Sequence, residues 1–61
     1  MTLMQYIRLR RISRAEQLLL TTKMSVSEIC MSCGYENFSF FSRIFRSVTG
    51  MAPTEYRKKK G

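Results

Sequence analysis

A chain of 61 residues is enough for one small domain and too short to enclose a large enzyme pocket. Its 11 Lys and Arg residues against four acidic ones, all Glu, give a net charge of +7. This excess suits a polyanionic partner, although a purely solubilising role would give the same composition. No segment approaches the roughly 18 apolar residues of a membrane span, and no secretory signal is recognisable. We therefore expect a cytoplasmic protein that is not an enzyme and binds no membrane.

The longest helical pattern covers residues 2 to 21, which contain neither Pro nor Gly. Its apolar residues lie on more than one side of a helical wheel, which predicts contacts with more than one neighbour. One broad side carries Met4, Ile7, Ile12, Ala15, Leu18 and Leu19, and the others are Tyr6, Leu9 and Leu20. Arg10 and Arg14 are one turn apart, and we consider them either phosphate contacts or ordinary solvated arginines.

A capping box predicts where the next helix begins, after a connector over residues 21 to 24. Ser25 and Glu28 have the spacing at which each side chain bonds to the other residue's backbone amide, so the helix should begin at Val26. Gly34 can close this helix in the left-handed conformation, and the turn that follows ends in Asn37, a good N-cap. The free amides near Ser25 and Val26 are a candidate phosphate site.

A second helix, expected at about residues 38 to 48, is amphipathic. Its apolar face carries Phe38, Phe41, Ile44, Phe45 and Val48, and its polar face carries Ser39, Ser42, Arg43 and Arg46. Two short helices around a glycine turn are typical of a helix-turn-helix, whose second helix enters the major groove of DNA. The sequence thus predicts a DNA-binding unit over residues 25 to 50.

The polar face of this helix offers the chemistry that base recognition needs. Arg43 can donate two hydrogen bonds to one guanine, and Ser39 and Ser42 can donate or accept. Arg46 lies farther from the helix N-terminus and suits a phosphate better than a base. Phe40, at the edge of the face, can meet a thymine methyl group or pack against the rest of the protein. The predicted base contacts are therefore Ser39, Phe40, Ser42 and Arg43.

Two cysteines, Cys30 and Cys33, have the C-x-x-C spacing of redox and metal sites. A zinc site needs two more Cys or His ligands, which the chain lacks, and a thioredoxin-type motif follows a strand. We expect both to be small buried residues, with no metal or cofactor bound. The predicted shared core of the two motif helices consists of Ile29, Cys33, Tyr35, Phe41 and Phe45.

The last segment, residues 51 to 61, should form a C-terminal helix and a basic tail. Pro53 suits the first helical position, and Tyr56 can fold back onto the core. Residues 57 to 60 are expected to be a frayed, solvated end, with weak, salt-sensitive phosphate contacts as the alternative. Residues 1 to 6 resemble residues 51 to 56, which suggests that the chain opens where an earlier copy of the motif ends.

These features closely resemble the C-terminal DNA-binding domain of the AraC/XylS-type family of bacterial transcription regulators. The matching motif residues are Ser25, Val26, Ser27, Glu28, Ile29, Gly34, Tyr35, Asn37, Ser39, Phe40, Phe41, Ser42, Arg43, Phe45, Arg46, Gly50, Pro53, Tyr56 and Arg57. Tyr6, Ile7, Arg11, Ile12, Ala15, Leu18 and Leu19 resemble the family's linker helix. Cys30 departs from the family's usual alanine, and Ala52 from its usual Ser or Thr cap.

The resemblance implies an all-α, homeodomain-like bundle with a linker helix at residues 1 to 22 and a helix-turn-helix at 25 to 50. It also implies that a first helix-turn-helix, which would end at residues 1 to 6, is missing. Phe38 is a further base-facing position by resemblance, whereas the periodicity places it at the rim of the core.

The function expected from the sequence is binding of specific double-stranded DNA near promoters, as part of a transcription activator. RNA polymerase is a second candidate partner. The alternative is a protein-interaction or dimerisation module that uses the apolar side of the N-terminal helix. Because one helix-turn-helix cannot cover both sides of that helix, we expect the chain to self-associate.

Overall fold

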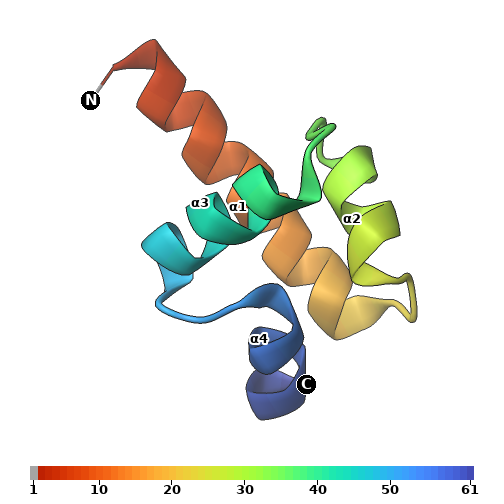
Figure 1. Ribbon diagram of the computed structural model, residues 1–61. Coiled ribbons are helices and arrows are strands. Elements are labelled where there is room, and N and C mark those ends of the chain that lie inside the picture. Colours follow the sequence, from red (N-terminus) through yellow and green to blue (C-terminus); the bar gives the residue numbers. More distant parts are fainter. Residues whose placement is uncertain (1) are drawn as a thin grey trace.

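Four helices and no strand make up residues 2–61, the part of the chain that the computed structural model describes (Figure 1). They are α1 (Leu3–Thr21), α2 (Val26–Ser32), α3 (Phe38–Thr49) and α4 (Pro53–Lys60). The three shorter helices all pack against α1, and α3 passes in front of it in Figure 1. The predicted all-α fold is confirmed. Met1, the first residue of the predicted repeat, lies outside the described residues.

Side-chain caps fix where three of the helices begin. The predicted capping box of α2 is present, with the Glu28 amide donating to Ser25 Oγ at 3.1 Å and the Ser25 amide donating to Glu28 Oε1 at 3.2 Å. A second capping box, which the sequence analysis missed, joins Thr2 and Gln5 at the start of α1. Asn37 Oδ1 accepts from an amide in the first turn of α3 at 3.0 Å. Local sequence therefore determines where these helices begin.

The turn between α2 and α3 is closed by glycine in the left-handed conformation. Gly34 has a φ of +90°, its amide donates to the Met31 carbonyl at 3.1 Å, and the Tyr35 amide donates to the Cys30 carbonyl at 3.1 Å. These two bonds form a Schellman motif. A side chain at position 34 would also be strained and would contact the Arg11 guanidinium, whose carbon lies 3.4 Å from an added Cβ. The positive φ at position 34 thus requires glycine, and the absence of a side chain leaves room for Arg11.

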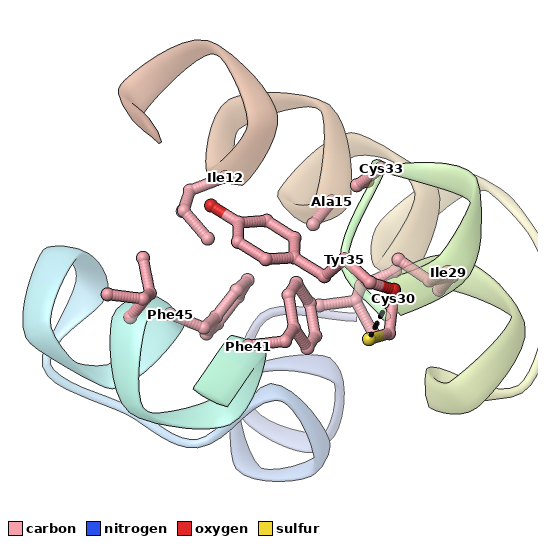
Figure 2. Packing of buried hydrophobic residues seen from close by; sticks show 10 residues of the cluster. Ile12, Ala15, Ile29, Cys30, Cys33, Tyr35, Phe41 and Phe45 are labelled. Atoms are coloured by element: carbon pink, nitrogen blue, oxygen red, sulfur yellow. Dashed lines mark hydrogen bonds between the residues drawn. The ribbon is translucent and has the colours of Figure 1, made fainter. Parts of the chain in front are cut away.

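The core lies between α1 and the α2–α3 pair (Figure 2). The buried side chains are Ile12, Ala15, Leu19, Ile29, Cys30, Cys33, Tyr35, Phe41, Ile44 and Phe45. Phe41 occupies the centre, with its ring centroid 5.4 Å from that of Tyr35 and 5.9 Å from that of Phe45. The predicted shared core and the buried positions of both cysteines are confirmed.

Apolar side chains are exposed near the ends of α3 and in the first half of α1. Phe38 is 46% exposed and Val48 is 37% exposed, although both belong to the predicted apolar face of α3. They lie in the first and last turns of α3, where no neighbouring helix covers them. On α1 the buried residues begin only at Ile12, so the apolar side chains before it are exposed. These are Leu3, Met4, Tyr6, Ile7 and Leu9.

The segment from Arg57 to Lys60 is not a frayed tail, because it continues α4 and its first residue is tied to α1. Arg57 Nε donates to the Leu19 carbonyl at 3.0 Å, and Nη2 donates to the Thr22 carbonyl at 3.1 Å. The guanidinium thereby satisfies carbonyls at the C-terminal end of α1, where a positive charge is also favourable. The sequence analysis failed to find this contact because it joins residues 35 and 38 positions apart.

Tyr56 folds back onto the core as predicted. Its hydroxyl donates to Glu16 Oε2 at 2.8 Å, and its ring lies edge-on to Phe45 at a centroid distance of 5.4 Å. Ala52, at the N-cap of α4, makes no side-chain cap bond. This is expected, because alanine has no polar side-chain atom. Within residues 2–61, no helix has the length and apolar character needed to cross a membrane.

Candidate nucleic-acid interface

The outer face of α3 carries a shallow groove. Its lining residues are Phe38, Ser39, Ser42, Arg43, Arg46 and Ala52. The structure therefore brings together all four residues of the predicted polar face. They are held in place from behind, because Phe41, Ile44 and Phe45 on the opposite side of α3 are buried against the rest of the core. A helix anchored in this way presents its polar face as a fixed surface.

The two exposed phenylalanines beside this groove differ in their surroundings. Phe40 is 50% exposed and leans on Tyr35, with 6.1 Å between ring centroids, and it does not line the groove. Phe38 lines the groove and rests against Phe41, with 6.4 Å between centroids. The sequence named Phe40 as a base contact and placed Phe38 at the rim of the core. In the structure, Phe38 lines the groove and Phe40 does not.

The N-terminus of α2 is the second predicted contact region. Its first amides have no partner within the helix, and Ser25 Oγ accepts from the amide of Glu28. The amides of Val26 and Ser27 thus remain for an anion. The Glu28 carboxylate, however, bonds to the Ser25 amide and places a negative charge in the same turn. The local field at this end of α2 is therefore weaker for anions than that of an uncapped helix.

A second basic region, the arginine hollow, lies between α1 and the C-terminal end of α2. Its lining residues are Arg10, Arg11, Ser13, Arg14, Gln17, Ser32 and Cys33. It shares no residue with the groove on α3. The only ion pair among residues 2–61 joins Lys59 and Glu55, so the arginines of the hollow have no carboxylate partner.

Within the arginine hollow the three guanidinium groups are held differently. Arg11 lies over the Tyr35 ring, 5.3 Å from its centroid, in a cation–π contact that the sequence did not reveal. Arg10 is 6.0 Å from the ring centroid of Tyr6 on its own helix. At 100° per residue, Arg10 lies on the side of α1 opposite its buried residues. Arg14 faces the C-terminal end of α2, where its charge acts on the Cys33 thiol.

Cys33 forms part of the wall of the hollow, yet neither cysteine is set up for thiol chemistry. Burial raises the pKa of the Cys30 thiol, and burial also raises that of Cys33, where the charges of Arg14 and Arg11 oppose the shift only in part. Both thiols are therefore protonated at neutral pH, which disfavours nucleophilic attack. The Cys30 Sγ instead donates to the Tyr35 carbonyl at 3.5 Å and supports the turn.

Comparison with known proteins identifies the family of this chain. Residues 1–59 match the sequence model of a helix-turn-helix domain family. The chain belongs to the AraC/XylS-type family.

Relatives of known name are similar over nearly all of this AraC/XylS-type chain. The HTH-type transcriptional activator RhaR of Salmonella heidelberg (strain SL476) is 46% identical over 57 residues, which are 93% of this chain and 20% of the relative. RhaR of Salmonella arizonae is 44% identical over 57 residues, with the same coverage. The chain therefore spans about a fifth of the length of the curated relatives it matches.

Solved structures agree with the fold. The C-terminal domain of the two-component response regulator yesN from Fusobacterium nucleatum has a TM-score of 0.91 at 30% identity, covering 93% of this chain and 55% of that one. The C-terminal domain of AraT, a response regulator from Geobacillus stearothermophilus, has a TM-score of 0.92 at 29% identity, covering 95% of this chain and 48% of that one. This AraC/XylS-type chain thus corresponds to about half of each solved domain.

Proposed function

We propose that this chain binds specific sequences of double-stranded DNA by placing α3 in the major groove, as part of a bacterial transcription activator. The observation that carries the proposal is the groove on α3, where two serines and two arginines lie on the outer face of a helix anchored by its buried side. A helix of this width fits the major groove of B-form DNA, and short hydroxyl side chains allow close approach to the bases.

The residues of α3 have distinct proposed roles. Arg43 donates two hydrogen bonds to O6 and N7 of one guanine, and Ser39 and Ser42 bond to neighbouring base edges. Phe40 contributes at the edge of the same face. Arg46, one turn nearer the C-terminus, contacts a phosphate and fixes the position of the helix. The free amides of Val26 and Ser27, next to Ser25 at the start of α2, contact a second phosphate.

Arg10 and Arg14 are proposed to contact phosphates outside the segment that α3 reads. They are exposed and have no carboxylate partner, which favours an anionic partner. They lie in the arginine hollow, which shares no residue with the groove of α3, so we assign them to phosphates other than the one that Arg46 contacts.

The names of the relatives support the regulatory part of the proposal. RhaR is a transcriptional activator, and this chain matches a fifth of it. We propose the same kind of activity for the protein that carries this domain, with RNA polymerase as the partner on which an activator acts.

The test is selection from a library of random duplexes with the purified chain, followed by titration at several salt concentrations. We expect one short enriched motif that contains a guanine, and an affinity that falls steeply and linearly on log–log axes as salt rises. Absence of any enriched motif would overturn the proposal, and a flat salt dependence would show that phosphates are not contacted.

A second candidate function is protein interaction through the first half of α1. Leu3 is 73% exposed and Met4 is 70% exposed, and the apolar side chains of Tyr6, Ile7 and Leu9 are exposed beside them. An exposed apolar surface of this kind favours self-association or a protein partner. Sedimentation at high protein concentration tests it, because a monodisperse monomer would exclude self-association through α1.

A further inference from the structure

The arginine hollow has the size and the lining of a site for a small anion. Its volume is about 460 Å³, within the range of about 300 to 1,000 Å³ that small-molecule sites occupy. Its lining includes three arginines, two serines and one glutamine, all of which can donate hydrogen bonds. None of the four glutamates lines it, and Glu16, Glu28 and Glu55 are each bonded elsewhere in the structure. The hollow therefore carries positive charge that no carboxylate in its lining neutralises.

Arg11 and Arg14 act on the same part of the hollow, beside the C-terminal end of α2. Burial raises the pKa of the Cys33 thiol in the wall, and the charges of both arginines oppose that rise. Arg11 is already held over the Tyr35 ring at 5.3 Å from its centroid, so binding an anion costs it little further side-chain freedom. Arg10, one turn before Arg14 on α1, adds a third guanidinium group to the lining.

The last turn of α2 is the one part of the lining that disfavours an anion, because carbonyls at a helix C-terminus carry partial negative charge. Two of these carbonyls are occupied, however, since those of Cys30 and Met31 accept hydrogen bonds from the amides of Tyr35 and Gly34. The hydroxyl of Ser32 also lines the hollow and can donate a hydrogen bond. The end of α2 therefore adds a donor to the hollow.

Phosphate is the chemistry that this lining fits. A guanidinium group is a planar fork that donates paired hydrogen bonds to phosphate oxygens. A phosphate of the DNA backbone carries one negative charge, whereas a terminal phosphate group carries about 1.5 to 2 at pH 7. Because three guanidinium groups line one hollow, the best match is an ion that concentrates several charges. We propose that the arginine hollow binds a small soluble anion that has two adjacent phosphate groups.

This site goes beyond the proposed function, because it requires no contact between α3 and DNA. Arg10 and Arg14 are also proposed to contact DNA phosphates, so the test must separate a free diphosphate from the phosphodiester of the backbone. Inorganic pyrophosphate is the probe for the free diphosphate, and dimethyl phosphate is the probe for the phosphodiester.

The purified chain is titrated with each anion by isothermal calorimetry, without DNA and at constant ionic strength. We expect one pyrophosphate to bind per chain, about tenfold or more tightly than dimethyl phosphate, because it accepts more charge-assisted hydrogen bonds. Arg14→Gln should weaken pyrophosphate binding about tenfold, because one guanidinium fork is lost.

Arg8→Gln is the matched control. It makes the same change of charge on the same helix, at an exposed residue that does not line the hollow. The affinity of this variant for pyrophosphate should stay within about twofold of the wild-type value, because solvent and salt screen a distant exposed charge. Equal losses in Arg8→Gln and Arg14→Gln would show that the net charge alone attracts the anion, and would overturn the inference.

Two further outcomes would also overturn the inference, namely equal affinities for the two anions and the absence of saturable pyrophosphate binding. A second measurement uses the wild-type chain, so it does not depend on the folding of Arg14→Gln. In NMR spectra, the Nε–Hε signals of Arg11 and Arg14 should shift as pyrophosphate is added, while that of Arg8 stays in place; shifts of all three alike would contradict a site in the hollow. Because no DNA is present, failure here leaves the proposed function standing, and failure of the DNA selection leaves this site standing.

Discussion

The groove on α3 and the arginine hollow between α1 and α2 are both basic, but they are built for different kinds of contact. In the groove, two arginines stand beside serines and a phenylalanine, so hydrogen bonds of defined direction and an apolar contact are available together. The hollow is also lined by Ser13 and Ser32, but it lies between two helices, and Arg11 within it is held over the Tyr35 ring. Net charge thus predicts an anionic partner, whereas the neighbours of each arginine predict whether it can select a base.

The largest expected effect separates these two regions directly. Arg43→Ala should weaken binding to the selected duplex by about 1 to 3 kcal/mol and relax the preference at one base pair, because a bidentate contact to guanine is lost. Arg10→Ala is the matched control and should leave the preference intact. Repeating the selection with both variants measures this, and an unchanged motif with Arg43→Ala would remove the distinction between groove and hollow.

The next effect concerns the turn that links the two regions. Gly34→Ala should lower the free energy of unfolding by about 1 to 2 kcal/mol, because an L-residue is strained at a φ of +90°. Gly50→Ala is the control, since Gly50 has a φ of +83° and nothing lies within 4 Å of an added Cβ there. Urea denaturation of both should show a slightly larger loss at position 34, where Arg11 must also shift. A loss confined to position 50 would contradict the role given to this turn.

A smaller effect is expected when the outer arginines of the hollow are neutralised. Replacing Arg10 and Arg14 together by Gln should reduce the log–log salt slope by up to about 1.8, or about 0.9 for each phosphate contact, without changing the selected motif. Arg46→Gln provides the comparison from the groove and should reduce the slope by about 0.9. If the double variant keeps the wild-type slope, Arg10 and Arg14 make no phosphate contacts.

The smallest effect tests how α4 holds α1 beside the α2–α3 pair. The hydrogen bond from Tyr56 to Glu16 raises the pKa of the Tyr56 hydroxyl, with a further contribution from burial. The unfolded chain therefore releases this proton at lower pH than the folded chain. Stability from this bond should be complete below the ordinary tyrosine pKa of about 10 and should be lost as pH rises through the folded-state pKa.

Thermal melts of the wild-type chain and of Tyr56→Phe measure this loss. The melts should span about pH 8 to pH 11, a range that brackets the reference tyrosine pKa of about 10. The difference between the two proteins should shrink at alkaline pH. A difference that stays constant would mean that the hydroxyl does not titrate in this range.

Local signals made most of the fold predictable. The capping box of Ser25 and Glu28 and the glycine at position 34 act through bonds that span three to five residues, and a sequence displays such spacings directly. The polar face of α3 was predictable for the same reason, because helical periodicity alone places its serines and arginines together.

The remaining features depend on where neighbouring helices end. A helical wheel places Phe38 and Val48 on the apolar face of α3, but it does not show how much of that face a neighbouring helix covers. The positions of Arg11 over Tyr35 and of Arg57 on the carbonyls of α1 depend on contacts between segments far apart in the chain. Charged residues of this kind look solvated in a sequence, and only tertiary structure distinguishes a cap or a stacked cation from a free side chain.

The bonds from Arg57 to Leu19 and Thr22 also determine when the domain can be completed during its synthesis on the ribosome. The C-terminal end of α1 is made early, but its carbonyls receive their guanidinium partner only after 38 further residues have followed Leu19. Until α4 has left the exit tunnel, α1 can pack against α2 and α3 only while the carbonyls at its C-terminal end remain exposed to water. Completion of the DNA-binding unit is therefore tied to translation of α4.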